Sequence, residues 1–198
     1  MIYLIILFVI TTYLVASIPF GLIVSKKFAH KDIREYGSKN IGATNVTRIL
    51  GKKLGFLTLI LDAAKGAVMV ILAKIIFKDA QYTSIIVAFT GFTAVIGHVF
   101  PIYLGFKGGK GVATTMAVIL AINPLFGLIT IMVWIVIFLA TKISAAASLL
   151  SITFTTLSAI YIEVNLEQII LYLALLILVF LRHRENLIRL RDGEENKL

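Results

Sequence analysis

Long apolar runs separated by short polar links constrain the fold of this chain more than any other feature. A helix needs about 20 apolar residues to cross a hydrocarbon core of about 30 Å. Hydrophobic residues make up 60% of the chain and its mean hydropathy is +1.01, far above a soluble domain. We predict an all-α integral membrane protein in which residues 1–198 form a single polytopic domain. The runs cover residues 1–24, 54–77, 82–104, 112–140, 143–162 and 167–181.

The first run is expected to remain in the membrane as a span. No basic region precedes it, and its apolar stretch is too long for a typical cleaved signal peptide. Pro19 and Gly21 should kink or loosen its last turns, before Lys26 and Lys27 close it.

Residues 112–140 form either one long tilted helix or two helices broken at Asn123 and Pro124. Asparagine is a good N-cap and proline a good first helical residue, so the local chemistry favours the break. The break would leave residues 112–121 as a helix of only about 15 Å, which must recruit loop residues or lie against its neighbours.

The distribution of basic residues decides between the two arrangements. With the break, every lysine and arginine except Lys65, Lys74 and Lys78 lies on one side of the membrane. Without it, Lys142 and the basic tail move to the opposite side, against the preference of basic residues for the cytoplasm. We therefore predict seven transmembrane helices, with the N-terminus outside, the C-terminus in the cytoplasm and the link 163–167 outside.

The net charge of +9 does not indicate nucleic acid binding, because the basic residues lie in short links between the apolar runs. Anionic lipid or an anionic substrate fits this distribution better. The chain has no cysteine, and His30, His98 and His183 lie far apart in sequence. We therefore expect no nucleic acid partner, no metal and no cofactor.

A glycine-rich basic loop covers residues 105–115. Glycines let backbone amides converge on one point and lysines add positive charge, which together suit a phosphate group. The spacing is not that of the nucleotide P-loop. A flexible loop whose lysines only set the orientation in the membrane is the other interpretation. The candidate phosphate-binding residues are Lys107, Gly108, Gly109, Lys110, Gly111 and Thr114.

A second polar motif covers residues 37–48, ahead of the second apolar run. Its hydroxyl and amide side chains can bind a polyol, and the fork of Arg48 can bind phosphate oxygens. The alternative is a solvated loop whose side chains cap the neighbouring helices. More uncharged hydrogen-bonding groups are present than two caps require, which favours a small polyol phosphate. These groups are Ser38, Asn40, Thr44 and Asn45.

Ionisable residues within the apolar runs are further candidates. His98 can act as a base, position a hydroxyl or donate to a backbone carbonyl freed near Pro101. Asp62 and Lys65 share one helix well inside a run, and either pair with each other or orient the loops from behind the site.

The basic tail 182–191 carries His183 and Asn186 at helical spacing. A short interfacial helix here would direct both side chains toward the bundle while its arginines contact anionic head groups. An ordinary basic membrane anchor is equally compatible with this spacing.

Taken in order along the chain, these motifs resemble those of the PlsY family. PlsY proteins are bacterial membrane glycerol-3-phosphate acyltransferases that use acyl phosphate as the donor. The resemblance covers nearly the whole chain, and the ordered combination is far more specific than any single motif. The similar segments are residues 17–21, 37–48, 62–66, 97–101, 106–114 and 183–187.

The resemblance implies transfer of a fatty acyl group to the 1-hydroxyl of glycerol 3-phosphate, which gives lysophosphatidate for phospholipid synthesis. It implies an active site at the cytoplasmic face of the bacterial inner membrane, and a soluble partner enzyme that makes acyl phosphate. Acyl-CoA would not be the donor. The absence of a His-x-x-x-x-Asp pair agrees, because Tyr103 follows His98 at that spacing and Ile188 follows His183.

The substrates implied by this resemblance both carry phosphate, so the basic motifs should divide between them. The residues expected to hold acyl phosphate are Lys107, the amides of residues 108–111 and, nearby, Lys110. The residues expected to hold glycerol 3-phosphate are Arg48, Ser38 and Asn45. The remaining polar wall would consist of His98, His183 and Asn186.

An acyl phosphate is already activated, so its transfer needs orientation and charge stabilisation more than a protein nucleophile. We expect direct attack by the hydroxyl, without a covalent acyl-enzyme. Either His98 or a substrate phosphate oxygen would take the proton, with His98 positioning more than abstracting.

Two other functions explain part of the pattern. A transporter for a phosphorylated solute would also use polar motifs in broken spans, but here these motifs gather at one membrane face. A structural scaffold explains the apolar runs and leaves the polar motifs without a role.

Overall fold

The structure is a computed structural model that describes residues 1–162 and 164–198, and this part of the chain contains helices and no strand. The prediction that the link 163–167 faces outward involves Glu163, which lies outside the described residues. The α-helices are α1 (Ile2–Ala16), α2 (Phe20–Ala29), α3 (Ala43–Leu50), α4 (Lys52–Ile76), α5 (Thr83–Val99), α6 (Val112–Ile122), α7 (Pro124–Thr141), α8 (Ser144–Tyr161), α9 (Leu166–Arg182) and α10 (Arg184–Arg191). Two short 3-10 helices are η1 (Ile33–Glu35) and η2 (Ile102–Leu104).

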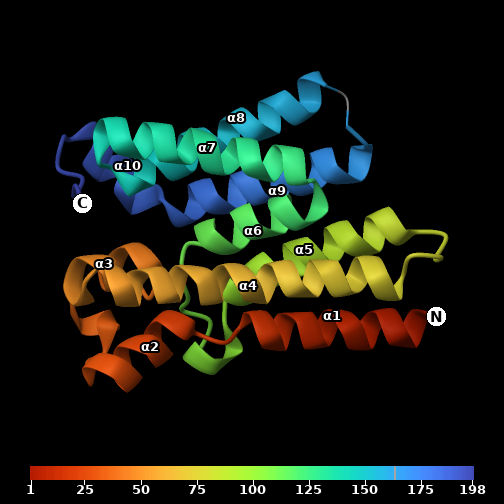
Figure 1. The fold of residues 1–198 in the computed structure, drawn as a ribbon, viewed down its shortest axis with the longest axis horizontal. Coiled ribbons are helices and arrows are strands. Elements are labelled where there is room, and N and C mark those ends of the chain that lie inside the picture. The colour runs from red at the N-terminus through yellow and green to blue at the C-terminus, as the bar shows by residue number, and fades with distance from the viewer. Residues whose placement is uncertain (163) are drawn as a thin grey trace.

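The long helices run along the long axis of the molecule (Figure 1). Helix α4 packs against α3, α5 and α6, α7 packs against α6 and α8, and α9 packs against α5 and α8. The short helices α2, α3 and α10 lie at one end with the C-terminus, and the N-terminus lies at the other end (Figure 1). Two basic segments that are far apart in sequence, residues 25–53 and the tail, therefore share one end of the bundle.

Within the described residues, five helical stretches are long and apolar enough to cross a membrane, and α9 with α10, bent by 63°, would make a sixth. Helix α6 has 11 residues and is apolar but shorter. Many large apolar side chains, such as Leu128 and Ile177, are exposed on the outside of the bundle, as on a surface that faces lipid. The all-α prediction is confirmed. The five stretches are Ile2–Ala29, Lys52–Ile76, Thr83–Leu104, Pro124–Thr141 and Ser144–Tyr161.

The predicted break at Asn123 is confirmed. Helix α6 ends at Ile122, the Asn123 side chain accepts from the Phe126 amide at 3.4 Å, and Pro124 is the first residue of α7. The last carbonyls of α6, at Ala121 and Ile122, accept hydrogen bonds of 2.8 and 2.9 Å from the Lys74 ammonium. A cation at a helix C-terminus offsets the partial negative charge of the unpaired carbonyls, so Lys74 stabilises this short helix.

The first apolar run is interrupted earlier than expected and its helix continues further. Helix α1 ends at Ala16, and α2 continues to Ala29, past the predicted end of the run at residue 24. The break frees the Ile18 carbonyl, which accepts a 2.9 Å hydrogen bond from Lys65. Lysines in the last turn of α2 extend the helix because cations are favoured at a helix C-terminus.

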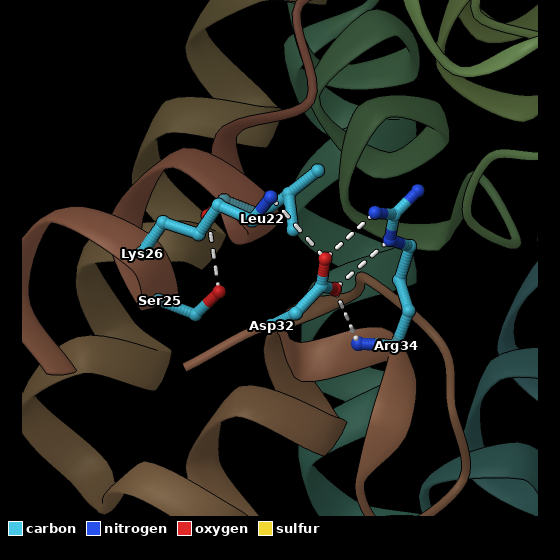
Figure 2. Close-up of polar contacts among 5 residues, drawn as sticks. All are labelled: Leu22, Ser25, Lys26, Asp32 and Arg34. Atoms are coloured by element: carbon cyan, nitrogen blue, oxygen red, sulfur yellow. Dashed lines mark hydrogen bonds and ion pairs between the residues drawn. The ribbon is translucent and has the colours of Figure 1, made fainter. Parts of the chain in front are cut away.

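Asp32 ties the end of α2 to η1, at the entry to the polar segment. Figure 2 shows its carboxylate between Lys26 and Arg34. Arg34 donates from its backbone amide at 3.1 Å and from its guanidinium at 2.9 and 2.6 Å, and the Lys26 ammonium lies 3.3 Å away. Hydrogen bonding by Arg34 holds the pKa of Asp32 well below its usual range. The carboxylate therefore stays ionised and fixes the approach to residues 37–48.

Candidate active site

One cavity of about 640 Å³ reaches from α3 and α10 into the space between α4, α6 and α7. Side chains from all three polar motifs line it, so the folded chain brings these distant motifs together. The predicted site residues that line the cavity are Ser38, Asn40, Thr44, Asn45, Arg48, Asp62, His98, Lys110, Gly111, His183 and Asn186. Those that do not line it are Lys65, Lys107, Gly108, Gly109 and Thr114.

The Asn45 side chain holds the loop of the first motif together through hydrogen bonds to backbone groups. Its side-chain oxygen accepts from the Ser38 amide at 3.0 Å, and its side-chain nitrogen donates to the carbonyls of Ile33, Tyr36 and Asn40 at 3.3, 3.1 and 2.9 Å. The side chain is 2% exposed, and these contacts occupy both of its polar atoms. Asn45 therefore holds the loop in shape from within α3, and it caps neither neighbouring helix.

Three side chains of the same motif remain available for a ligand. Arg48 lies half-buried at the cavity wall, and its guanidinium forms no hydrogen bond or ion pair with any described residue. Thr44 lies 3.1 Å from the hydroxyl of Ser144, which also lines the cavity. Together with Ser38 they combine a planar cation with neutral hydroxyls, the chemistry that suits a phosphorylated polyol.

The glycine-rich loop uses part of its backbone internally. The amides of Gly108 and Gly109 donate to the carbonyls of Val99 and His98 at 3.1 and 3.2 Å, so they pair with the C-terminal end of α5 and are not free for a ligand. A β-carbon at Gly109 would collide with Nε2 of His98, so only glycine lets the loop pack on this ring. Lys107 is exposed and does not line the cavity, which leaves Lys110 as the lysine of the loop at the site.

Lys110 and the tail form a connected polar wall. The Lys110 ammonium donates to the side-chain oxygen of Asn186. Burial lowers the pKa of Lys110 to about 8. The negative charge of Glu195 partly offsets this lowering, and the positive charge of Arg189 adds to it. Near neutral pH this ammonium is therefore charged yet close to losing its proton.

His183 is buried beside Lys110 at the junction of α9 and α10. Burial, and then the nearby Lys110 charge, lower the pKa of His183 to about 4. Its Nδ1 lies 2.8 Å from the Val179 carbonyl, which can only accept, so the proton of the neutral ring lies on Nδ1. Nε2 is then an acceptor. The short tail helix is confirmed, and it directs both His183 and Asn186 into the cavity.

A buried cluster of three ionisable residues lies behind the site. The Asp62 carboxylate is 2.9 Å from the Lys65 ammonium and 3.5 Å from Nδ1 of His98, and all three side chains are at most 4% exposed. Thr114 donates to the Asp62 backbone carbonyl at 2.9 Å. The pairing of Asp62 with Lys65 is confirmed. The contact between Asp62 and His98 joins residues from different helices, so spacing along the chain could not reveal it.

Among the described residues, three further charged side chains at the cavity escaped the motif analysis: Lys52, Arg189 and Glu195. The Glu195 carboxylate accepts from the Asn186 side-chain nitrogen at 2.7 Å and from Arg189 at 2.8 Å. Arg189 follows Asn186 at helical spacing, which is a usable signal, whereas nothing in the local sequence marks Glu195. These contacts hold Asn186 from the side opposite to Lys110.

The cationic groups at the cavity suit an anion better than a metal. Within residues 1–162 and 164–198 no group of three or more His, Cys, Asp or Glu side chains is arranged to hold a metal ion. Arg48, Lys52, Lys110 and Arg189 instead present positive charge to the lining. Phosphate oxygens are the natural ligands of such groups.

The far part of the cavity is apolar, and we call it the apolar arm. Each of three helices contributes residues that recur at the spacing of one helical face. The residues of the apolar arm are Phe56, Leu59, Ile60 and Ala63 on α4, Met116, Ala117 and Leu120 on α6, and Ile131, Trp134, Ile135 and Phe138 on α7. The cavity thus combines a basic polar end with a hydrocarbon-like arm between helices.

Residues 6–193 match the family model described as glycerol-3-phosphate acyltransferase. The chain belongs to this family. It is therefore an acyltransferase and a multi-pass integral membrane protein, and its role in phospholipid synthesis follows from the family. The PlsY resemblance of the sequence motifs is confirmed.

Relatives of this acyltransferase are similar over almost their whole length. The glycerol-3-phosphate acyltransferase of Neisseria gonorrhoeae (strain NCCP11945) is 41% identical over 190 residues, which cover 96% of this chain and 95% of the relative. That of Pelagibacter ubique (strain HTCC1062) is 43% identical over 188 residues, 95% of this chain and 94% of the relative.

Two solved structures of PlsY (YgiH), an integral membrane glycerol 3-phosphate acyltransferase, share this fold. The glycerol 3-phosphate form superimposes with a TM-score of 0.91 at 38% identity, and the lysophosphatidic acid form with a TM-score of 0.89 at 37% identity. Each match covers 98% of this chain and 95% of the solved chain.

Proposed function

We propose that this acyltransferase moves a fatty acyl group from acyl phosphate to the 1-hydroxyl of glycerol 3-phosphate, giving lysophosphatidate and phosphate. The observation that carries the proposal is the single cavity in which a basic polar end continues into the apolar arm. A polar phosphate substrate and a lipid-tailed one can meet there. The solved relatives, one in a glycerol 3-phosphate form and one in a lysophosphatidic acid form, support this choice of acceptor and product.

Arg48 and Ser38 would hold glycerol 3-phosphate, with Thr44 beside them and with Asn40 and Asn45 shaping the loop. Arg48 has no other partner among the described residues, so its guanidinium is free to take phosphate oxygens bidentately. Lys52 adds a second cation to the same part of the lining.

The acyl phosphate would lie against Lys110 and the start of α6. Because the amides of Gly108 and Gly109 are occupied and Lys107 is away from the cavity, Lys110 and Gly111 replace them in the proposed donor site. The first amides of α6 have no intrahelical partners and carry partial positive charge, which favours a phosphate group.

The transfer would proceed by direct attack. The 1-hydroxyl oxygen forms a bond to the acyl carbon, the bond from that carbon to the phosphate oxygen breaks, and phosphate leaves with both electrons. Lys110 and the α6 amides stabilise the charge on the departing phosphate. The hydroxyl proton passes to a substrate phosphate oxygen, because the lowered pKa of His183, about 4, makes its ring a weak base near neutral pH.

His98 would act as a positioning residue. Its ring lies between the Asp62 carboxylate and the glycine-rich loop, and its backbone carbonyl accepts the Gly109 amide. The Asp62 carboxylate, paired with Lys65, would fix the orientation of the ring from the side away from the loop. A rigid ring at this place fixes the loop that carries Lys110, so orientation of the donor phosphate depends on the buried cluster.

Acyl transfer by the purified protein in lipid tests the proposal. Glycerol 3-phosphate would be supplied with either palmitoyl phosphate or palmitoyl-CoA, and lysophosphatidate would be measured. Product from acyl phosphate alone is expected. Product only from the thioester would keep the acceptor and reject the donor, and no product from either would reject the reaction.

The proposed topology has seven crossings, with the N-terminus outside and the C-terminus and active site at the cytoplasmic face of the bacterial inner membrane. The basic ends of α2, α3 and α10 lie together at one end of the bundle, which supports this orientation (Figure 1). Because the chain has no cysteine, a single cysteine at Asp79, on the turn after α4, can be tested with a membrane-impermeant reagent. Labelling from outside is expected, and labelling only after lysis would contradict the topology.

The fall in activity at alkaline pH should reflect loss of the proton from the Lys110 ammonium. Its ammonium is charged below a pKa of about 8 and neutral above it, so kcat/KM for acyl phosphate should fall as the pH rises through about 8. Lys110→Arg retains the charge to far higher pH and should remove this fall, even if its maximum rate is lower. An unchanged fall in the arginine variant would assign the titration to another group.

A further inference from the structure

We propose that Leu120 is the floor of the apolar arm and that its size sets the point at which a bound acyl chain turns out toward the bilayer. This inference rests on the proposed function, because it assigns the apolar arm to the acyl chain of the donor. It adds the residue that decides which acyl chains the site accommodates.

The apolar arm closes where α6 and α7 touch. The two helices are joined at Asn123, and a β-carbon on Gly127 would collide with the backbone of Leu120. Glycine therefore permits a contact between helix backbones at this level, and no side chain separates them. Both helices line the arm between this contact and the polar end, and Leu120 is the last residue of α6 in the lining.

The distance from the phosphate site to this floor is short for a fatty acid. From Gly111 to Leu120 the helix advances roughly 13 Å at about 1.5 Å per residue. An extended alkyl chain advances roughly 1.3 Å per carbon, from a C–C bond of about 1.5 Å at a tetrahedral angle. About ten carbons therefore fit between the first α6 amides and Leu120, and a longer chain must turn.

The side of the apolar arm offers the exit for the remaining carbons. Phe56 and Ile60 on α4 line the arm and are yet 64% and 47% exposed, and Ile135 on α7 is 40% exposed. These side chains open the arm to the surface that faces lipid. Lipid tails are as apolar as leucine side chains, so moving the end of an acyl chain from the arm into the bilayer costs little free energy. Selection among acyl chains of different length therefore comes from the shape of the floor.

The α7 wall of the apolar arm is fixed at Trp134. The Trp134 indole donates to the Ser148 hydroxyl at 3.1 Å and stacks on Phe138 at a centroid distance of 4.8 Å. It cannot swing away without losing both contacts. A larger side chain at residue 120 must therefore shorten the space for the acyl chain instead of displacing Trp134.

The test compares Leu120→Phe with Leu128→Phe, using octanoyl, dodecanoyl and palmitoyl phosphate as donors. Leu128 lies next to Gly127, but it is 56% exposed and outside the cavity lining, so it is a matched control. In Leu120→Phe, kcat/KM for the dodecanoyl and palmitoyl donors should fall about tenfold, the usual effect of overfilling an apolar pocket. The octanoyl donor ends before the floor and should be used as by the natural protein, which also shows that the variant is folded.

Leu120→Ala tests the floor in the opposite direction, and should raise the ratio of kcat/KM for palmitoyl to octanoyl phosphate by about twofold or more. Equal effects on all three donors, or equal effects of the two phenylalanine variants, would overturn the role of Leu120. Failure of the natural protein to use any of the three donors would instead reject the proposed function.

Discussion

Replacing Arg48 by alanine is expected to lower kcat/KM for glycerol 3-phosphate by about 100-fold or more. Arg48 lines the polar end of the cavity without a protein partner, so its guanidinium is available to the substrate phosphate. Hydrogen bonds to charged groups contribute about 1.5 to 3 kcal/mol each, and two of them account for at least this factor. The measurement is steady-state acyl transfer at varied glycerol 3-phosphate.

Two companion variants make the Arg48 result specific. Arg48→Lys keeps the charge but cannot bind bidentately, so it should recover only part of the loss. Arg191→Ala removes an arginine whose side chain is 75% exposed and should leave kcat/KM nearly unchanged. An Arg48→Ala variant with a normal KM for glycerol 3-phosphate would show that the acceptor phosphate binds elsewhere.

Replacing Asp62 by asparagine is expected to cause a large loss of stability, of about 3 to 5 kcal/mol. The substitution leaves the Lys65 ammonium, which is 2% exposed, without its carboxylate partner. An unpaired buried charge is costly because the low-polarity interior solvates it poorly. The thermal midpoint of unfolding in detergent should therefore fall clearly, whereas Asp79→Asn on the exposed turn should not change it.

A double variant separates the stability of the buried cluster from its role in orienting His98. Asp62→Asn with Lys65→Met removes both charges and should restore most of the thermal midpoint. Its kcat should nevertheless stay about tenfold low, because His98 still lacks the carboxylate that faces its Nδ1. Recovery of both stability and kcat would limit Asp62 and Lys65 to a purely structural role.

Much of the fold could be read from the sequence because the signals are local. Apolar runs of bilayer length predict helices through the cost of placing polar groups in hydrocarbon, and the break at Asn123 follows from capping chemistry. The predicted end of the first run was less accurate, since Lys26 and Lys27 are still helical in the last turn of α2. Helix ends depend on caps and neighbours as much as on composition.

The site was predicted as three motifs, and their meeting in one cavity is confirmed. The division of labour within the motifs was harder to predict. Asn45 was expected to hold glycerol 3-phosphate, and its side chain lines the cavity while it hydrogen-bonds to the backbone of neighbouring residues. Lys107 was expected to hold acyl phosphate with Lys110 nearby, and of the two only Lys110 lines the cavity. These differences depend on which way each loop residue faces, and the neighbouring backbone sets that direction.

By itself the sequence determined the membrane class, the helix break at Asn123, the family and the kinds of polar side chain that line the cavity. Each of these follows from residue chemistry or from order along the chain. Only the tertiary structure decided that Asp62 faces His98, that Glu195 holds Asn186 and that Leu120 meets Gly127. Such contacts join residues on separate segments, and they depend on how those segments rotate and pack against one another, which local propensity does not encode.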